Sequence, residues 1–422
     1  MSPPFTRLLS VKPAFPQGWL LALAAVLAAW WAYAPGLHGA FLFDDFGNLP
    51  ALGASGPVDH WPTFWRYITS GEADPTGRPL ALLSFLIDAH DWPADPYPFK
   101  RTNLVLHMLN GLLLWQLLRT LGGTLAPAPE ARAQVERAAA LGMAFWLLHP
   151  LFVSTTLYIV QREAMLPATC ALAGLLAWLH GRSLYTHGRM ARSTLWMALG
   201  LGGGTLLGVM SKANGALLPV YALLIEGLVL RGAQPIPTPA ARRYRRWLAL
   251  LAGLPACAVL AYLGLEGGRL IVHGIGPARP WTLPQRLLTE PGIVLGYLRL
   301  LLLPRSYTAG LFNDQIQAAQ GLWSPPGTAL TLAALLALAG FAVAVRKRWP
   351  IVSLALLFFL AAHLVESTTI PLELYYEHRN YVPALLLFWP LGWWLAGLDL
   401  RAPNHAAAPS PQTRWLRVAL AA

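Results

Sequence analysis

Charged residues are scarce in this 422-residue chain: Asp, Glu, Lys and Arg together make up only 12% of it. Soluble globular proteins carry about 25% charged residues, so this scarcity excludes an ordinary water-soluble enzyme. Disorder is excluded as well, because hydrophobic residues make up 56% of the chain and the mean hydropathy is +0.48. The composition indicates a protein with most of its mass inside a membrane.

Cysteine is nearly absent, and the two in the chain, Cys170 and Cys257, both lie inside apolar runs. This excludes a disulfide-stapled secreted scaffold and gives no basis for a redox or metal site. Acidic residues are also few, since 19 Asp and Glu stand against 31 Lys and Arg, for a net charge of +12. The positive residues gather in short segments between apolar runs, so we expect them to set membrane topology and we expect no nucleic-acid partner.

Long apolar runs recur along the chain. A helix needs about 20 mostly apolar residues to cross the hydrocarbon core, and about ten runs approach that length. The sequence therefore predicts an all-α polytopic membrane protein with about 10–11 transmembrane helices and with interfacial helices in its first outer segment. The predicted spans are Trp19–Leu37, Leu104–Leu121, Ala138–His149, Ala164–His180, Thr194–Met210, Ala213–Leu230, Trp247–Gly264, Thr328–Val345, Ile351–His363 and Tyr381–Leu398.

The segments between these spans separate by charge. Segments rich in Arg and Lys alternate with segments that hold most of the Asp and Glu residues. Because positive residues concentrate on the cytoplasmic side, we place both termini there. The acidic segments, about 37–103, 150–163, 265–327 and 364–380, then face outward. Residues 1–400 form one membrane domain, and 401–422 form a Pro/Ala-rich cytoplasmic tail with a short apolar end.

Two adjacent carboxylates, Asp44 and Asp45, directly follow the first predicted span. Carboxylates so close to hydrocarbon are energetically costly. One interpretation is a general base that deprotonates an acceptor hydroxyl, with a pKa raised by its neighbour and by partial burial. The other is a helix-capping Asp beside a solvated loop acid, and the sequence leaves both open.

Four outer turns each offer a cation beside a helix end: Arg78, Arg162, Lys212 and Arg379. Guanidinium and ammonium groups bind phosphate strongly, and helix N-termini favour the same anion. We therefore expect the four cations to share one phosphate site. The alternative for each of them is contact with lipid headgroups at the end of a span.

Two further patterns predict structure. Asn103, His107 and Asn110 are spaced by four and three residues, which places them on one helical face and predicts interhelical hydrogen bonds. The segment Pro284–Pro304 carries Arg286 and Glu290 among leucines, which predicts a helix lying in the membrane interface.

Seven stretches stand out in order along the chain: FDDFGNL at 43–49, GRPLALLSF at 77–85, NLVLHMLNGLLLW at 103–115, HPLFVSTTLYIVQRE at 149–163, SKANGALLP at 211–219, RLLTEPGIVLGYLRLLLLP at 286–304 and VESTTIPLELYYEHRNYVPA at 365–384. The ordered set resembles the membrane half of the transmembrane-and-TPR-containing O-mannosyltransferases and their bacterial relatives. Those proteins belong to the C-type glycosyltransferase (GT-C) superfold, which includes bacterial pilin glycosyltransferases.

The resemblance implies an inverting glycosyltransferase that moves a sugar from a polyprenyl-phosphate carrier to an acceptor hydroxyl at the outer face. It assigns the catalytic base to Asp44 or Asp45 and implies no certain cofactor, although a divalent cation would suit a diphosphate carrier. The donor-phosphate site would comprise Arg78, Arg162, Lys212, His378 and Arg379, with Glu163 and Glu377 as substrate contacts and no metal ligand.

The acceptor stays open, because no TPR array follows residue 395. It is either Ser or Thr of a periplasmic or surface protein, such as a pilin, or a glycolipid such as lipid A or O-antigen. The tripeptide at 161–163 and the abundance of Ala, Leu, Pro and Trp favour a bacterial inner membrane, with the site facing the periplasm. A lipid-linked-sugar flippase or transporter is the rival class, but it predicts ionisable residues at mid-span, where the sequence has few.

Overall fold

The structure, a computed structural model, describes residues 17–277, 279–305 and 316–398, and within these ranges it contains helices and no strand. The tail predicted at 401–422 lies outside the described residues. The α-helices are α1 (Gln17–Tyr33), α2 (Asp45–Asn48), α3 (Trp61–Ile68), α4 (Pro79–Phe85), α5 (Pro96–Leu125), α6 (Arg132–Leu147), α7 (Val153–Thr156), α8 (Arg162–Thr186), α9 (Met190–Met197), α10 (Gly204–Ser211), α11 (Leu218–Ile225), α12 (Arg231–Ala233), α13 (Thr238–Leu248), α14 (Leu254–His273), α15 (Leu283–Leu302), α16 (Thr328–Ala344), α17 (Pro350–Ala362) and α18 (Trp389–Ala396).

The all-α polytopic fold is confirmed. Seven helices of the described chain are long and apolar enough to cross a membrane, and each coincides with one of the predicted spans. They are Gln17–His38, Pro96–Leu125, Ile159–Thr186, Met190–Ser211, Ala213–Ala233, Ala240–His273 and Thr328–Lys347. The span predicted at 138–149 falls in a pair of helices bent by 50°, Pro129–Leu147 and Pro150–Thr156, while that at 351–363 corresponds to the 13-residue α17.

The last predicted span, Tyr381–Leu398, is wrong as a continuous helix. Residues 381–388 form successive turns, and only the eight residues of α18 are α-helical. Pro383 and Pro390 explain the break, since proline has no N–H to donate and disfavours the helical conformation of the residue before it. The hydropathy of this segment instead reflects burial, because Leu385 and Leu386 are almost fully buried.

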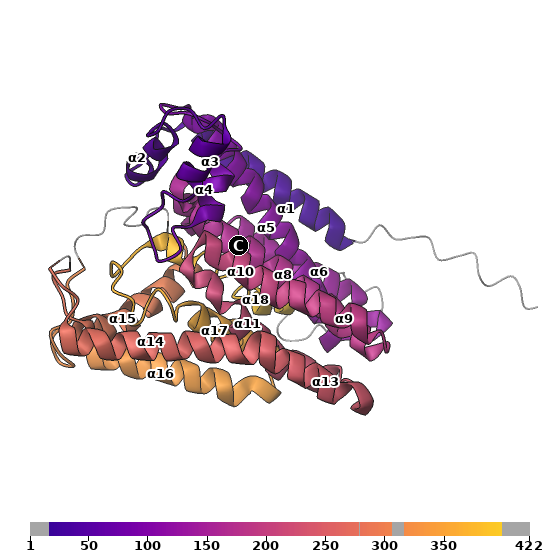
Figure 1. Ribbon diagram of the computed structural model, residues 1–422. Helices are drawn as coiled ribbons and strands as arrows, with labels where there is room; N and C mark the ends of the chain where they lie inside the picture. Colours follow the sequence, from indigo (N-terminus) through magenta and orange to yellow (C-terminus); the bar gives the residue numbers. More distant parts are fainter. Residues whose placement is uncertain (1–16, 278, 306–315, 399–422) are drawn as a thin grey trace, which may run out of the picture.

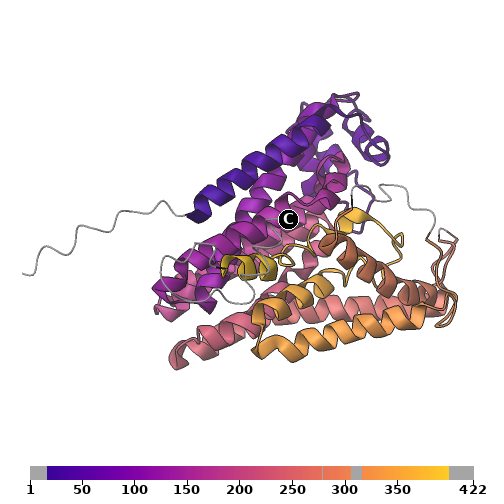
Figure 2. The same cartoon turned by 180° about the vertical axis from the view of Figure 1, so that it is seen from behind.

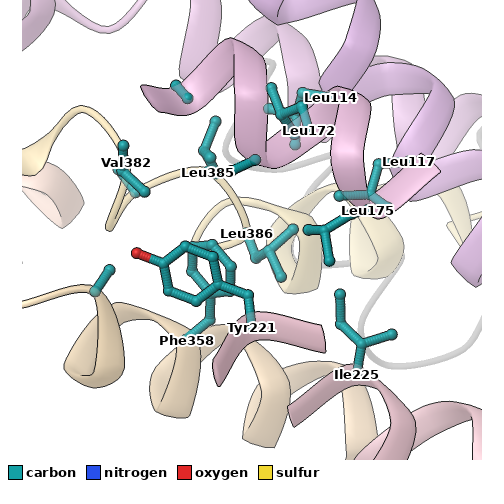
Figure 3. Packing of buried hydrophobic residues seen from close by; sticks show 14 of the residues in the cluster. Leu114, Leu117, Leu172, Leu175, Tyr221, Ile225, Phe358, Val382, Leu385 and Leu386 are labelled. Atoms are coloured by element: carbon teal, nitrogen blue, oxygen red, sulfur yellow. The ribbon is translucent and has the colours of Figure 1, made fainter. Parts of the chain in front are cut away.

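These turns lie inside the molecule, where helices from distant parts of the chain meet. Figure 3 shows Val382, Leu385 and Leu386 among leucines of α5 and α8, with Tyr221 of α11 and Phe358 of α17 nearby. Tyr221 and Phe358 pack with ring centroids 4.4 Å apart. The segment that follows Asn380 is therefore held by the main hydrophobic core.

The polar stripe of α5 makes the interhelical contacts that its spacing predicts. Asn103 donates to the carbonyl oxygen of Ile159 at 3.2 Å, and Asn110 donates to that of Met165 at 3.2 Å. His107 lies 2.8 Å from the hydroxyl of Tyr381. These bonds join α5 to the start of α8 and to the turns after residue 380.

The short helices α2, α3 and α4 gather at one end of the molecule, and α9 and α13 reach the opposite end (Figures 1 and 2). The 364–380 segment runs between α4 and α15 at the first of these ends. The candidate site residues therefore lie in short turns, short helices or loops, except for those at the start of α8. The long helices fix the positions of these segments.

Candidate active site

Asp44 and Asp45 have different surroundings. Asp45 is fully buried, and its two carboxylate oxygens accept hydrogen bonds from the backbone N–H groups of Leu42 at 2.9 Å and Val160 at 2.8 Å. Burial raises the pKa of Asp45, and the two backbone bonds oppose that rise. Asp45 thus ties the loop after α1 to the turn before α8.

Asp44 is half-buried and hydrogen-bonds mainly through its backbone, whose N–H donates to the hydroxyl of Tyr158 at 2.8 Å. Burial raises the pKa of Tyr158, and the neighbouring Asp44 carboxylate raises it further. The preceding residue, Phe43, has a φ of 32°, a left-handed conformation that costs free energy in a non-glycine residue. The fold therefore maintains a strained backbone next to the Asp44 carboxylate.

Arg78 lies in a tight turn directly before α4. A Cβ on Gly71 would lie 1.9 Å from the carbonyl oxygen of Gly77, so the two sides of the turn approach as closely as glycine permits. Arg78 itself has a φ of 52°. Its guanidinium forms ion pairs with Asp74, at 2.9 Å, and with Glu163 at the start of α8. Those two carboxylates raise the pKa of Arg78 above its ordinary value, although burial opposes them.

Lys212 occupies the turn between α10 and the next span. A Cβ on Gly215 would lie 2.1 Å from the backbone carbon of Gly208, so these glycines allow the chain to double back. The Lys212 ammonium pairs with Glu366 at 2.5 Å. Burial by itself would raise the pKa of Glu366, but the charges of Lys212 and Arg379 hold it below its ordinary value.

Glu377, His378 and Arg379 lie in a 3₁₀ turn (Glu377–Asn380), where all four residues are buried. Arg379 donates to the carbonyl oxygen of Glu373 at 2.5 Å, while its second terminal nitrogen is 3.7 Å from the Glu373 carboxylate. The guanidinium also lies over the ring of Tyr376, 5.4 Å from its centroid. One face of the Arg379 guanidinium is thus covered by an aromatic ring, and its ion pair with Glu373 is long because that carboxylate pairs more closely with Arg279, at 2.7 Å.

Charged groups from several segments shift the pKa of His378 and that of Tyr376. Burial holds the pKa of His378 well below its ordinary value, and three positive charges lower it further. These belong to Lys212, Arg379 and Arg78. Burial raises the pKa of Tyr376, and the carboxylates of Glu373 and Asp44 raise it further. The rings of Tyr376 and His378 stack 5.0 Å apart.

The structure therefore brings together most of the residues that the sequence singled out. Arg78, Lys212 and Arg379 come from segments that touch, since Thr76 donates to the carbonyl oxygen of Val209 at 3.3 Å and Lys212 pairs with Glu366. Asp44 shifts the pKa of Tyr376, and the three cations shift that of His378. Glu163 joins them through Arg78. Glu377 lies in the same turn as His378.

Arg162 does not join this cluster. It is 1% exposed, and it pairs with Asp88 at 2.5 Å while donating to Asn103 at 2.6 Å. Its remaining donors reach the carbonyl oxygens of Ser84 and Phe99. Because protein groups occupy all its nitrogens, Arg162 is suited to holding α4, α5 and α8 together rather than to binding a phosphate.

Arg286 and Glu290 of α15 are site-supporting residues that sequence reasoning assigned to a helix in the membrane interface. Both are buried, and they pair at 2.9 Å. The Arg286 guanidinium donates to four carbonyl oxygens of the 364–380 segment, those of Glu366, Thr368, Leu372 and Glu373. The i, i+4 spacing of Arg286 and Glu290 indicates an ion pair. Nothing in the sequence indicates the loop whose carbonyl oxygens Arg286 binds.

A cavity of about 520 Å³ lies between α15 and α16. Its walls are mostly apolar and include Ile293, Leu300, Thr331 and Tyr375. Among the described residues, no three His, Cys, Asp or Glu side chains gather as a metal site requires. The divalent cation that the sequence allows stays a prediction.

The fold and this cluster define a class: an all-α polytopic membrane protein with a buried, charge-rich site at one end. Over 190 residues the chain is 26% identical to the protein O-mannosyl-transferase Tmtc3 of Drosophila melanogaster. The match covers 42% of this chain and 20% of Tmtc3, so the chain corresponds to a small part of that relative. No family model and no solved structure matches the chain.

Proposed function

We propose that this chain is a membrane glycosyltransferase of the GT-C type, which transfers a sugar from a polyprenyl-phosphate donor to an acceptor hydroxyl with inversion. The observation that carries the proposal is a set of paired cations beside one aromatic pair: Arg379 lies over Tyr376, which stacks on His378, while Lys212 pairs with Glu366 of the same loop. The partly exposed carboxylate of Asp44 raises the pKa of Tyr376. The name of Tmtc3 supports sugar transfer to a protein hydroxyl. In a bacterial inner membrane, such a site would face the periplasm.

The acceptor would be activated by Asp44. Its carboxylate takes the proton of the acceptor hydroxyl as the oxygen attacks the anomeric carbon of the donor. General-base assistance of this kind contributes a factor of about 10²–10⁴. Asp44 suits the role better than Asp45, because both oxygens of Asp45 already bind backbone N–H groups.

The leaving group would be stabilised by the cations. As the bond between the anomeric carbon and the phosphate oxygen breaks, its electron pair leaves with the polyprenyl phosphate. Lys212 has two N–H groups beyond the one that faces Glu366. The second terminal nitrogen of Arg379 is paired only loosely with the Glu373 carboxylate, at 3.7 Å. These donors can bind the developing charge in a site of low dielectric, where such contacts are worth several kcal/mol.

The polyprenyl chain needs an apolar path away from this phosphate. The cavity between α15 and α16 supplies one, since Tyr375 lies both in its wall and next to Tyr376 in sequence. Acceptor choice is the finer part of the proposal. We favour Ser or Thr of a periplasmic or surface protein, such as a pilin, over a glycolipid.

The test is transfer by the purified full-length chain, with polyprenyl-phosphate mannose as donor and a periplasmic protein fraction as acceptor. Asp44→Asn should lower turnover by a factor of about 10²–10⁴ and leave donor binding within about twofold of wild type, because it keeps the backbone bonds of Asp44. Asp59→Asn, at an exposed acid of the same loop, is the matched control and should retain wild-type turnover. Full activity of Asp44→Asn would show that the base assignment is wrong.

A further inference from the structure

Helices α9 and α13 reach the end of the molecule opposite the candidate active site (Figures 1 and 2), and six arginines lie on or directly before them. Four lie on α13 and two at the start of α9, and α13 packs against both α8 and α9. All six side chains are exposed. They form what we call the arginine patch: Arg189, Arg192, Arg242, Arg243, Arg245 and Arg246.

The orientation of α13 is fixed by its other face. Ala240, Tyr244 and Leu248 are buried there. The Tyr244 hydroxyl donates to Glu226 at 2.8 Å, and its ring packs on that of Tyr185 at 5.4 Å. The four arginines of α13 are therefore directed away from the bundle by its packing.

No acidic group of the described chain neutralises the patch. Segments 187–193 and 238–248 contain no Asp or Glu. The neighbouring carboxylate, Glu226, is engaged by Arg182 at 2.8 Å and by Tyr244. None of the six arginines forms an ion pair with a described residue. Six uncompensated charges of one sign create a strong local attraction for anions.

The depth of the patch identifies the anion. Ala240–His273 is one of the helices long enough to cross the membrane, and its apolar stretch begins at Trp247, directly after Arg246. The guanidinium groups are thus at the level where a bilayer presents its headgroups. Arginine binds phosphate oxygens in pairs of hydrogen bonds, and basic clusters at the ends of spans attract anionic lipids.

We propose that the arginine patch is a binding site for anionic phospholipid headgroups, distinct from the donor site and at the other surface of the membrane. It goes beyond the proposed function and does not depend on it. The basic turn at Arg346, Lys347 and Arg348 provides a comparison, because it also follows a membrane-length helix. Arg346 donates to its own helix, as Arg245 of the patch does, and Arg348 lies over Trp349; this turn differs from the patch in holding three cations rather than six.

The test measures binding of phosphatidylglycerol and phosphatidylcholine to the full chain in detergent by native mass spectrometry. Replacing all four α13 arginines by glutamine (R242Q, R243Q, R245Q and R246Q) should weaken phosphatidylglycerol binding about tenfold or more, since each such charge contributes about a fivefold effect near a membrane surface. Phosphatidylcholine binding should not change. The corresponding four lysine substitutions should retain most of the affinity, which separates charge from folding.

The control replaces Arg346, Lys347 and Arg348 by glutamine and should weaken phosphatidylglycerol binding less than the α13 variant does, because this turn holds three cations against the six of the patch. The proposal is overturned if the α13 glutamine variant binds phosphatidylglycerol as wild type does, or if phosphatidylcholine binds equally well. An equal loss in the control would also overturn it, because that result would indicate a general effect of net charge. Sugar transfer is a separate measurement, so failure here leaves the proposed function untouched.

Discussion

At the scale of single residues, neighbours in sequence have different tasks in this molecule. The Asp44 carboxylate raises the pKa of Tyr158 and of Tyr376, while Asp45 uses both oxygens to bind the backbone of Leu42 and Val160. The same division separates Arg162, whose nitrogens all bind protein groups, from Glu163, which pairs with Arg78. In each pair, one residue supports the local fold and the other belongs to the charged cluster.

Asp45→Asn should therefore reduce stability more than Asp44→Asn does. Asn keeps one acceptor oxygen but replaces the other by an NH₂ group facing a backbone N–H, and hydrogen bonds to a charged group contribute about 1.5–3 kcal/mol. We expect a loss of about 2 kcal/mol in the free energy of unfolding, measured by thermal denaturation in detergent. Equal melting curves for the two variants would contradict this division of roles.

Arg162→Gln should be more damaging to folding. The change leaves the buried carboxylate of Asp88 without its partner, and breaking a buried pair costs about 3–5 kcal/mol. Protein that still folds should bind the donor with unchanged affinity. Weakened donor binding without a loss of stability would place Arg162 in the phosphate site after all.

At the scale of elements, the 364–380 loop is the part of the site that depends most on its support. It carries Glu366, His378 and Arg379, yet only Glu377–Asn380 within it is helical. Arg286 of α15 binds four of its carbonyl oxygens, and Tyr297 accepts a hydrogen bond from the N–H of Tyr376 at 2.8 Å. The position of Arg379 is thus determined by α15.

Arg286→Gln should lower both stability and donor affinity. Loss of the guanidinium releases the loop and leaves the buried Glu290 without its ion pair, at a cost of about 3–5 kcal/mol. Adding Glu290→Gln removes the unpaired carboxylate, so the double variant should regain much of the stability. Donor affinity should stay at least about tenfold below wild type, since the loop is still unsupported. Recovery of both properties together would show that Arg286 does not position the loop.

The elements also show what the sequence can and cannot predict. Seven spans were predictable because hydropathy and length suffice for a helix that crosses a membrane. The same rule failed at residues 381–388, whose apolar side chains fill the core as turns. The sequence identified the cations near helix ends as candidates. It did not show that three of them lower the pKa of His378, or that Arg162 forms an ion pair with Asp88. Those facts depend on contacts between residues far apart in the chain.

At the scale of the whole molecule, the two ends differ in chemistry. The end with α4 carries paired acids and cations and the stacked rings of Tyr376 and His378, whereas the end reached by α9 and α13 (Figure 1) carries six exposed arginines that form no ion pair with a described residue. This polarity agrees with the topology expected from the positive residues, with the charged cluster on the outer side. Because the charged groups lie mainly at the two ends, the long helices between them contribute few candidate site residues.

The central claim of the proposal is that the charged cluster breaks the bond between a sugar and a polyprenyl phosphate rather than moving the intact glycolipid. The most direct measurement is the release of free polyprenyl phosphate by the full-length chain, reconstituted in vesicles with polyprenyl-phosphate mannose, before and after an acceptor protein is added. The account predicts release that requires the acceptor and that Asp44→Asn abolishes. Glycolipid that crosses the bilayer and stays intact, with or without acceptor, would contradict the account and indicate a flippase.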